Sequence, residues 1–587
     1  MRGIQQRRQQ SVDFAFQLSS GHVHPVIRES PPDTGIPQRF RARGSLTAGD
    51  AGQSRATAKT KTDCELQHSE DTQWTQIRIR LQYHQNTGIP FSIAPELPFQ
   101  FRVSASFHIQ PLSDQLDVDQ AVTCFAREKL PLVLDSAGPY RAQDARYTFL
   151  TADPVATVRL DSVEYGDQPF ETLRRWQSLL PPTPSAMPPF CGGIAGLLSY
   201  ESGHAFERLP RVEDNQFKTP ALLAGLYDWA IVWDHLEPSV RLYVIELDHK
   251  EGHPSKTPAE RIAWVQGRLA ASREILSDGS DESTTEISES GTHDLTAPYR
   301  QAYELPSAGN VYSGFSREDY TAAVERVIEY IRAGDIFQAN LSQQITAPWT
   351  RDAVSLFRQV RRFNAAPFCG MFVASDFAVV SASPERFLQV RNGRDVETRP
   401  IKGTRRRQQS PIADLYTGNE LSSSEKDRAE NVMIVDLLRN DLSRVCEPGS
   451  VRVPAVCEIE VFETVQHLVS TVIGRLRPEC DLWDLFAATV PGGSITGAPK
   501  IRAMEIIAEL EPAARGAYCG NLFYVGPGGS FDSSILIRTF VLRNGAVQFP
   551  VGGGIVADSN PEDEYEETLH KAAGMLRCLG VNQNRRT

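Results

Sequence analysis

A single lysine in the motif Thr398-Arg-Pro-Ile-Lys-Gly-Thr404 has the surroundings expected of a reactive amine. Lys402 lies between Pro400 and Gly403, directly after an alternating segment, 387–396, that predicts a strand and a turn. A lysine held at a strand end inside a pocket loses solvation, its pKa falls toward neutrality, and the free amine becomes a nucleophile. The alternative is a surface lysine in a tight turn, so the motif needs support from the rest of the chain.

Two pairs of carboxylates stand in the first turns of two predicted helices. Asp427 and Glu430 are three residues apart, and so are Glu564 and Glu567, with Lys571 four residues beyond. Side chains at these spacings share a helix face, so each pair projects together. Carboxylates in this arrangement suit Mg²⁺, which takes a few of their oxygens and leaves positions for water and an anionic substrate. The alternative is two solvated helix faces with ordinary ion pairs.

Two glycine-rich stretches can bring the main chain close to an anion. Pro491-Gly-Gly-Ser-Ile-Thr-Gly-Ala-Pro-Lys500 runs into a predicted helix, 501–510, whose first N–H groups are free to bind one. It lacks the Gly-Lys-Ser/Thr ending of a P-loop. Gly552, Gly553 and Gly554 precede the last helix and would let a ligand approach closely. The alternative for both stretches is a plain turn.

His467 and Arg538 stand in segments that alternate polar and apolar residues. An inward-pointing arginine on such a strand can clamp a carboxylate through two hydrogen bonds, whereas on the outer face it is an ordinary surface charge. For His467 the default interpretation is a hydrogen-bonded core histidine.

The composition restricts the class of protein that positions these groups. The chain has 587 residues, of which 41% are hydrophobic and 23% charged, as is typical of a soluble globular protein with a large core. Its net charge of −12 argues against nucleic acid as a partner. No apolar run approaches the ~20 residues that span a bilayer, which argues against a membrane protein. Nine scattered cysteines without a Cys-x-x-Cys pair favour a reducing compartment. We therefore expect a cytoplasmic enzyme.

Strand and helix patterns recur along most of the chain. Alternating segments predict strands at 130–134, 156–160, 193–200, 224–234, 240–246, 335–342 and 369–374. Helices are predicted at 258–276, 320–333 and 427–439, and after Asn560, with Ser316 and Asn560 as caps and Pro561 in a first turn. Many β segments with helices between them predict an α+β protein built on large antiparallel sheets.

These patterns divide the chain into four parts. Residues 1–110 are predicted to be a disordered extension, because 1–62 is rich in Arg, Gln, Ser and Gly and poor in acids. A transit peptide or a translation start placed too far upstream are the alternatives there. Residues 111–276 and 311–581 carry the ordered patterns. Between them, 277–310 is rich in Ser, Thr, Asp and Glu and predicts an acidic flexible linker or insertion.

Several longer motifs resemble those of the chorismate-utilising enzymes, which form anthranilate, aminodeoxychorismate, isochorismate or salicylate. The resemblance covers about 112–579. Its motifs are Ser383-Pro-Glu-Arg-Phe387, Pro400-Ile-Lys-Gly-Thr404, Asp427-Arg-Ala-Glu-Asn-Val-Met-Ile-Val-Asp436, Arg439-Asn-Asp441, His467-Leu-Val-Ser470, the glycine stretch 491–500 and Gly552-Gly-Gly-Ile-Val556. It implies an anthranilate-synthase-like fold, in which large antiparallel β-sheets form a sandwich with helices packed outside.

Two positions distinguish the branches of this family. Members that add water carry a lysine base where this chain has Gln338, and glutamine cannot take a proton from water, which favours ammonia as the nucleophile. Anthranilate synthases have alanine where this chain has Lys402, and an amine there implies the aminodeoxychorismate-forming branch. The alternatives are an anthranilate synthase, an isochorismate or salicylate synthase, and a binding subunit without catalysis.

The resemblance also implies a role for each candidate residue. Lys402 would attack C2 of chorismate while Glu385 protonates the leaving C4 hydroxyl, and ammonia would then add at C4 and expel the lysine. His467 and Thr496 complete the implied catalytic group. The implied Mg²⁺ ligands are Glu430 and Glu567, with Asp427 and Glu564 close by. The implied substrate-binding residues are Tyr524, Arg538, Gly552, Gly553, Gly554, Lys571, Ser494 and Gln338.

The implied source of ammonia is a partner. The chain shows no nucleophile-elbow cysteine with a glutaminase-like His and Glu, so a separate glutamine amidotransferase subunit is expected. In this family a Leu-Leu-Glu-Ser motif lies beside a tryptophan pocket, and the matching stretch here is Val133-Leu-Asp-Ser136. Leu134, Asp135 and Ser136 would line that pocket, and the aspartate in place of glutamate leaves tryptophan binding open.

Overall fold

The computed structural model describes residues 107–138, 145–182, 187–247, 256–277, 302–305, 308–408, 410–461 and 465–581, together with five strands nearer the N-terminus. The chain divides into two compact units, Met1–Ala105 and Ser106–Thr587. Most of the predicted linker lies outside the described residues.

The first unit contains one sheet. Its strands are β1 (Phe14–Ser19), β2 (His22–Ile27), β3 (Arg41–Thr47), β4 (Lys59–His68) and β5 (Thr75–Gln82), in the order β2-β1-β3-β4-β5. The residues between these strands lie outside the described ones, so the disorder expected for 1–110 stays a prediction.

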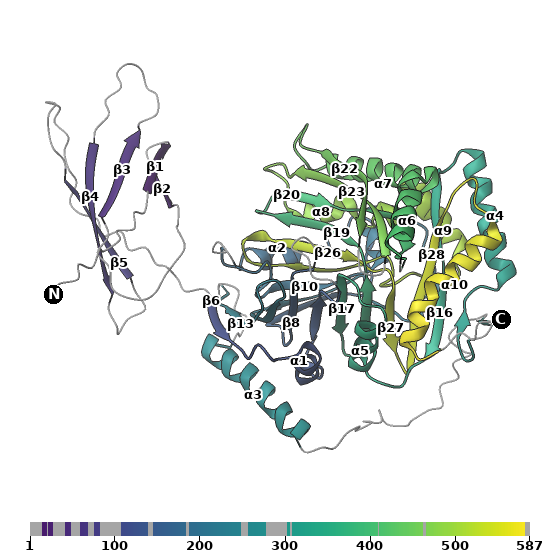
Figure 1. Cartoon of the computed structure of the whole chain (residues 1–587), viewed down its shortest axis with the longest axis horizontal. Coiled ribbons are helices and arrows are strands. Elements are labelled where there is room, and N and C mark those ends of the chain that lie inside the picture. Colours follow the sequence, from purple (N-terminus) through teal and green to yellow (C-terminus); the bar gives the residue numbers. More distant parts are fainter. Residues whose placement is uncertain are drawn as a thin grey trace. The chain divides into compact units, whose positions relative to one another are not determined.

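Two antiparallel sheets build the second unit (Figure 1). The first sheet runs β21 (Ile401–Arg406), β23 (Val465–Arg475), β20 (Asp395–Thr398), β19 (Arg386–Arg391), β26 (Phe531–Ile535), β25 (Asn521–Val525), β10 (Gly193–Leu198), β11 (Leu222–Tyr227) and β9 (Ala156–Leu160), with β22 (Arg452–Val461) paired to β23. We call it the ten-stranded sheet.

The second sheet has thirteen strands. It runs β14 (Tyr303–Glu304), β15 (Tyr312–Ser313), β16 (Gln338–Pro348), β28 (Ala546–Ile555), β27 (Thr539–Arg543), β18 (Ala378–Ser383), β17 (Phe368–Val373), β7 (Leu132–Asp135), β8 (Tyr147–Thr151), β12 (Trp229–Asp234), β13 (Ser239–Ile245) and β6 (Phe107–Pro111), with β24 (Gly497–Ala498) paired to β16. In the described part of the chain, no helix is long and apolar enough to cross a membrane.

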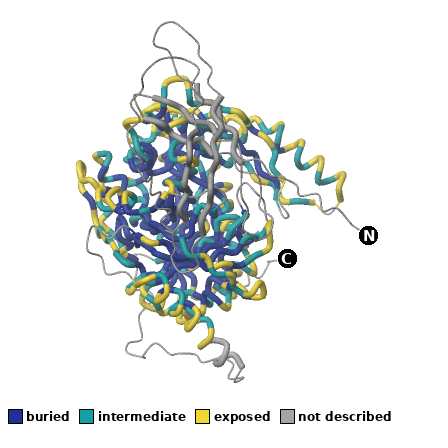
Figure 2. The backbone as a smooth tube through the Cα atoms, turned by 90° about the vertical axis from the view of Figure 1, so that its left-hand side faces the viewer, coloured by how far each residue is buried: buried dark blue, intermediate teal, exposed yellow. Residues whose placement is uncertain are grey.

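The two sheets pack face to face around a common hydrophobic core. Phe149 of β8 and Tyr524 of β25 come from different sheets, and their ring centroids are 5.6 Å apart. On the other face of the thirteen-stranded sheet, Trp229 packs 5.1 Å from Phe125. Figure 2 shows that the buried residues are concentrated along the strands. This arrangement confirms the predicted α+β sandwich with helices outside.

Four helices cover the outer face of the thirteen-stranded sheet. They are α1 (Val118–Phe125), α3 (Pro258–Ser277), α5 (Ala353–Phe363) and α10 (Pro561–Cys578). The predicted caps form: the side chain of Asn560 accepts from the N–H groups of Glu562 and Asp563 at the start of α10. Ser316 does the same for Asp319 in α4 (Arg317–Ala333).

The predicted strand 224–234 is two strands in different sheets. β11 ends at Tyr227 in the ten-stranded sheet, and β12 begins at Trp229 in the thirteen-stranded sheet. Between them lies Asp228, whose buried carboxylate is 2.9 Å from the guanidinium of Arg261 on α3. Because both strands are apolar on both faces, the periodicity does not show where the chain changes sheet.

Four helices lie beside the ten-stranded sheet and its loops (Figure 1). They are α2 (Glu171–Gln177), α6 (Pro411–Ser423), α7 (Glu425–Ser443) and α8 (Leu482–Thr489). Helix α9 (Lys500–Leu510) packs against β16 and β24 of the thirteen-stranded sheet. The glycine-rich stretch connects α8 to α9 and contains the single 3₁₀ turn Gly493–Ile495. We call residues 491–499 the glycine loop.

Candidate active site

Lys402 and Glu385 form the centre of the site. Lys402 is half-buried on β21, and its Nζ donates to the main-chain oxygen of Ser494 at 3.2 Å. Glu385 stands in the turn between β18 and β19 and is only 5% exposed. Burial raises the pKa of Glu385 to about 7, against the opposing effect of the Lys402 cation. A carboxyl with this pKa keeps its proton in a substantial fraction of molecules at neutral pH.

Burial shifts the pKa of the Lys402 amine in the opposite direction, downward. Burial lowers the pKa of Lys402, while the carboxylates of Glu430 and Glu385 oppose that shift. Burial disfavours the charged form of either group, so it moves the two pKa values toward each other. The pair therefore combines an amine that can be neutral with a carboxyl that can be protonated.

Three carboxylates from two helices converge beside Lys402. Burial raises the pKa of Glu430 on α7, and the negative charges of Asp427 and Glu564 add to this effect. Burial also raises the pKa of Glu564 on α10, with the charge of Glu567 acting in the same direction. The pKa of Glu567 is lowered overall, because the Nζ of Lys571 lies 2.7 Å from its carboxylate.

The negative charge of these carboxylates suits a divalent cation, but their oxygens do not lie close enough together to coordinate one. In the described part of the chain, no group of three or more His, Cys, Asp or Glu side chains could hold a metal ion. A positive ion would nevertheless relieve the mutual repulsion that adds to the effect of burial on the pKa of Glu430 and Glu564. Gly553 faces them, since a Cβ there would lie 3.2 Å from Glu564 Oε2 and 3.8 Å from Glu567 Oε1.

Asp427, predicted to lie close to the metal ligands, is hydrogen-bonded to an arginine. Its Oδ2 accepts from Nη2 of Arg405 at 3.0 Å. It also packs against Gly403, where φ is +76° and a Cβ would lie 2.9 Å from the Asp427 carboxyl carbon. Asp427 therefore supports the strand that carries Lys402, which explains why glycine follows the lysine.

Ser494 and Thr496 belong to the glycine loop, and the loop satisfies most of their hydrogen bonds internally. The Oγ1 of Thr496 donates to the main-chain oxygen of Gly492 at 3.0 Å. The main-chain oxygen of Thr496 accepts from the N–H of Asn340 at 2.8 Å, which fixes the loop against β16. Ser494 is the member of the loop that contacts Lys402 and Glu385.

His467 lies on β23, paired with the lysine strand. It is 4% exposed, and its Nδ1 is 2.8 Å from the Oγ1 of Thr404. This contact fixes the orientation of the imidazole. Thr404, its partner, is two residues from Lys402 on β21. The predicted hydrogen-bonded histidine is therefore present next to the lysine.

Gln338 and the three glycines face one another across two paired strands. Gly552, Gly553 and Gly554 lie within β28, paired with β16, and not in a loop as their sequence suggested. Gln338 is buried, and neither of its side-chain polar atoms has a partner among the described residues. A Cβ at Gly554 would meet the Gln338 amide, so a larger residue there would displace that side chain. Lys571 donates to the main-chain oxygen of Gly552 at 2.8 Å.

Arg538 lies in the link between β26 and β27 and not within a strand as predicted. Its φ of +52° places it in the left-handed region, and its main-chain oxygen accepts from the N–H of Ala382. The side chain is exposed and makes no ion pair among the described residues. A free guanidinium can bind a carboxylate of a ligand through two hydrogen bonds.

Tyr524 does not join this group. Its ring packs against Phe149 at 5.6 Å and Phe190 at 5.3 Å, in the core between the two sheets. Burial raises the pKa of Tyr524 well above its ordinary value, and the charge of Asp532 adds to this effect. The ring therefore lies between the two sheets, and the implied substrate-binding role stays a prediction.

The predicted tryptophan pocket is occupied by internal contacts. Asp135 is buried and bonds to Arg361 and to Thr148, each at 2.8 Å. Ser136 donates to the main-chain oxygen of Tyr147 at 2.7 Å, and Leu134 is half-buried. The aspartate therefore anchors an arginine of α5, and tryptophan binding stays a prediction.

Sequence reasoning missed a buried ion pair that fixes the glycine loop. Arg515 is 2% exposed, bonds to Glu511 at 2.7 Å and donates to the main-chain oxygen of Ile495 at 2.9 Å. It also donates to the main-chain oxygen of Asn340. The i, i+4 spacing of the two charges was visible, but it reads as a helix-surface pair, whereas α9 ends at Leu510.

Comparison with known proteins agrees with this geometry. The family model described as chorismate binding enzyme matches residues 136–577, and the chain belongs to this family. It is 42% identical to aminodeoxychorismate synthase component 1 of Klebsiella aerogenes over 68% of this chain and 80% of the relative. It is 38% identical to anthranilate synthase component 1 of Thermus thermophilus over 74% of this chain and 87% of the relative.

A solved structure shares the fold. The crystal structure of anthranilate synthase component I from Streptococcus pneumoniae aligns with a TM-score of 0.58 at 30% identity, covering 75% of this chain and 94% of the other. The sandwich that carries Lys402 and Glu385 is thus the fold of a chorismate-binding enzyme.

Proposed function

We propose that the chain is the synthase component of an aminodeoxychorismate synthase, converting chorismate and ammonia to 4-amino-4-deoxychorismate. Relatives of two activities match at 42% and 38% identity, so identity alone separates them weakly. The observation that carries the proposal is Lys402, a half-buried amine with a lowered pKa beside Glu385. A neutral amine in this position is a nucleophile, which an alanine cannot replace.

The proposed reaction uses Lys402 as a covalent catalyst. Its neutral amine forms a bond to C2 of the ring, the ring double bond shifts, and the C4 hydroxyl leaves as water after taking the proton of Glu385. Ammonia then bonds to C4, the double bond shifts back, and the C2–nitrogen bond breaks to release the lysine. The proton that ammonia loses returns to the Glu385 carboxylate, so both groups regain their starting states.

The other residues of the site bind and orient the substrate. Arg538 and the main chain of Gly552–Gly554 would hold the enolpyruvyl carboxylate. Mg²⁺, held by Glu430 and Glu567 with Glu564 beside them, would supply positive charge for the ring carboxylate. We leave Asp427 out of this set, because its carboxylate is engaged by Arg405.

The proposed nitrogen source is a second protein. The relatives are named as a component 1, which implies a further component. Ammonia is the nucleophile in the proposed reaction, so we propose a glutamine amidotransferase as that partner. We assign the product to the synthesis of 4-aminobenzoate and folate in the reducing cytoplasm, in agreement with eight free cysteines among the described residues.

The test is to incubate the purified protein with chorismate, Mg²⁺ and ammonium and to identify the product by chromatography and mass spectrometry. An aminodeoxychorismate peak, without an aromatic amine until a lyase is added, is the expected result. Anthranilate would show that Lys402 does not decide the product. Absence of any product, with ammonium or with an amidotransferase and glutamine, would contradict the proposal. A parallel reaction with EDTA tests the requirement for Mg²⁺.

A further inference from the structure

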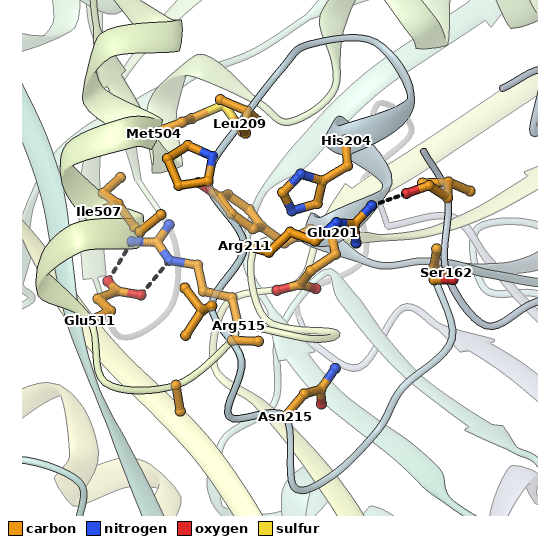
Figure 3. A pocket seen from close by; sticks show the side chains of 18 of the residues that line it. Ser162, Glu201, His204, Leu209, Arg211, Asn215, Met504, Ile507, Glu511 and Arg515 are labelled. Atoms are coloured by element: carbon orange, nitrogen blue, oxygen red, sulfur yellow. Dashed lines mark hydrogen bonds and ion pairs between the residues drawn. The ribbon is translucent and has the colours of Figure 1, made fainter. Parts of the chain in front are cut away.

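A cavity of about 130 Å³ lies outside the group formed by Lys402, Glu385 and the carboxylates (Figure 3). Its walls come from four separate parts of the chain: residues 161–163 after β9, the 3₁₀ turn Tyr200–Ala205, the loop before β11, and the segment that runs from α9 to Arg515. Liquid water occupies about 30 Å³ per molecule, so the cavity has room for a ligand of several non-hydrogen atoms. Nothing in the proposed reaction uses it.

Three buried oxygen atoms of the cavity lining have no partner among the described residues. They are Oε2 of Glu201, the hydroxyl oxygen of Tyr200 and Oγ1 of Thr219. Buried polar atoms are nearly always hydrogen-bonded, and a buried atom without a partner destabilises the fold. Three of them around one cavity therefore indicate that something else supplies the missing donors.

These oxygens are held in place by the surrounding structure. The second carboxylate oxygen of Glu201 accepts from the N–H of Gly516 at 3.2 Å. A Cβ at Gly516 would lie 2.7 Å from the Oγ1 of Thr219, so the main chain passes directly beside that hydroxyl. The Tyr200 ring is stacked on Arg515, whose guanidinium carbon is 4.9 Å from the ring centroid. The three acceptors thus form a fixed set.

The only formal charge among the three is the Glu201 carboxylate. The nearest cations already have partners: Arg515 pairs with Glu511, and Arg211 pairs with Glu164. Burial raises the pKa of Glu201 to about 7, against the opposing effects of the Gly516 N–H and the Arg515 cation. His204, which also lines the cavity, has a pKa lowered by burial, so it does not supply that charge at neutral pH.

We propose that this cavity binds a small protonated primary amine, of which the ammonium ion is the simplest. An R–NH₃⁺ group carries three N–H donors and one positive charge, which match three unpartnered oxygens of which one belongs to a carboxylate. An anion would face the Glu201 carboxylate, and an apolar ligand would leave all three oxygens unsatisfied.

A ligand in this cavity would touch the residue that fixes the glycine loop. Arg515 contacts Tyr200 on the cavity side and donates to the main-chain oxygen of Ile495 on the other side. The next residue in the loop toward the N-terminus is Ser494, which accepts the hydrogen bond of Lys402. Occupancy of the cavity is therefore coupled to the loop through a single side chain.

The test measures binding to the full-length protein by isothermal titration calorimetry and thermal shift. The probes are methylammonium and tetramethylammonium chloride, with potassium chloride at equal ionic strength. We expect methylammonium to bind and to raise the unfolding temperature, and tetramethylammonium, which has no N–H donor, to give no specific effect. Equal effects of all three salts would overturn the proposal, since charge alone would then account for them.

Two substitutions locate the binding in the cavity. Glu201→Gln keeps the acceptor for Gly516 and removes the charge, and Tyr200→Phe keeps the ring on Arg515. We expect at least tenfold weaker methylammonium binding in Glu201→Gln and a smaller loss in Tyr200→Phe. Glu213→Gln, at an exposed carboxylate outside the lining, is the control. Unchanged binding in Glu201→Gln would place the amine elsewhere and refute the assignment.

Two sources of the amine are separated by a further titration. If the site takes the ammonium ion itself, ammonium chloride binds more tightly than ethanolamine. If it takes a small organic amine, ethanolamine binds more tightly because it fills more of the cavity. Both results need the N–H donors, so both support the site. If neither amine binds, the proposal is refuted.

Discussion

Two sets of buried charges in this protein differ in how completely they are paired. Arg515 and Glu511 form a bidentate pair, and their remaining hydrogen bonds join main-chain groups of the glycine loop and β16 and the Ser342 hydroxyl. Lys402 and Glu385, by contrast, are close in space, yet Glu385 Oε1 has no partner among the described residues. Lys402 has one hydrogen bond, to a main-chain oxygen.

The difference separates structural charges from reactive ones. A fully paired buried ion keeps its ordinary protonation state and resists change, because any new arrangement leaves a charge unpaired. An incompletely paired amine or carboxyl has a shifted pKa and free positions for a ligand, which is what proton transfer and nucleophilic attack need. The paired set holds the loop on which the reactive set depends.

The largest effect is expected for the reactive lysine. Lys402→Ala should lower kcat for aminodeoxychorismate formation by about 10⁴-fold, since it removes the nucleophile. Lys402→Arg keeps the positive charge without a nucleophile at neutral pH and should be equally inactive. Product formation from chorismate and ammonium, followed by mass spectrometry, measures both. High activity of Lys402→Arg would mean that the site needs only the charge.

Breaking the Arg515–Glu511 pair should lower the stability of the fold. Arg515→Met leaves Glu511 as a buried unpaired carboxylate and should lower the free energy of unfolding by about 3–5 kcal/mol in urea denaturation. Arg502→Met is the matched control, because it breaks an ion pair with Asp335 in which both side chains are more than one third exposed. Its effect should stay below about 1 kcal/mol. Similar losses in both variants would contradict the distinction between the two sets.

Glu385→Gln tests the general acid. It should reduce kcat by about 10²-fold, because the amide cannot give a proton to the leaving hydroxyl. In the unsubstituted protein the rate should fall as pH rises above about 7, where Glu385 loses its proton. This alkaline limb should vanish in Glu385→Gln. A limb that persists there would assign the titration to another group.

The same shift has a consequence for stability. The folded-state pKa of Glu385 lies above its ordinary value of 4.5, so its protonated form stabilises the fold fully below that pH. This contribution is lost as pH rises through about 7, and urea denaturation of Glu385→Gln should lack that part of the pH dependence.

The smallest effect is expected at a contact within the site. Thr404→Val removes the hydroxyl beside His467 Nδ1 but keeps the shape of the side chain. One hydrogen bond is worth about 1 kcal/mol, so kcat/KM should fall about fivefold with little change in unfolding temperature. Thr417→Val, whose hydroxyl donates within α6, to the main-chain oxygen of Ala413, is the control and should leave kcat/KM unchanged.

Sequence patterns predicted the fold class and most of the site because local rules and motifs agree there. Asn560 and Ser316 cap their helices as expected, and Lys402, Glu385, Glu430 and Glu567 meet from four separate elements. The residues whose surroundings the sequence did not indicate are those whose position depends on the third dimension. Tyr524 and Arg538 sit in apolar, alternating sequence that gives no sign of a layer or a left-handed turn.

The Arg515–Glu511 pair and the cavity beside it could not be predicted for a related reason. Arg515 fixes the glycine loop because it donates to main-chain oxygens of that loop and of β16. No spacing within the sequence encodes that contact. A buried, unpaired oxygen is likewise a property of the assembled walls.

The interleaving of strands also governs how the chain can fold. Ile194 of β10 pairs with Val525 of β25, and Met371 of β17 pairs with Val133 of β7, so each sheet joins early and late segments. During synthesis the early strands leave the ribosome long before their neighbours exist, and their unpaired edges are templates for aggregation. Such non-local pairing slows folding. Neither sheet can therefore be completed before its late strands have left the ribosome.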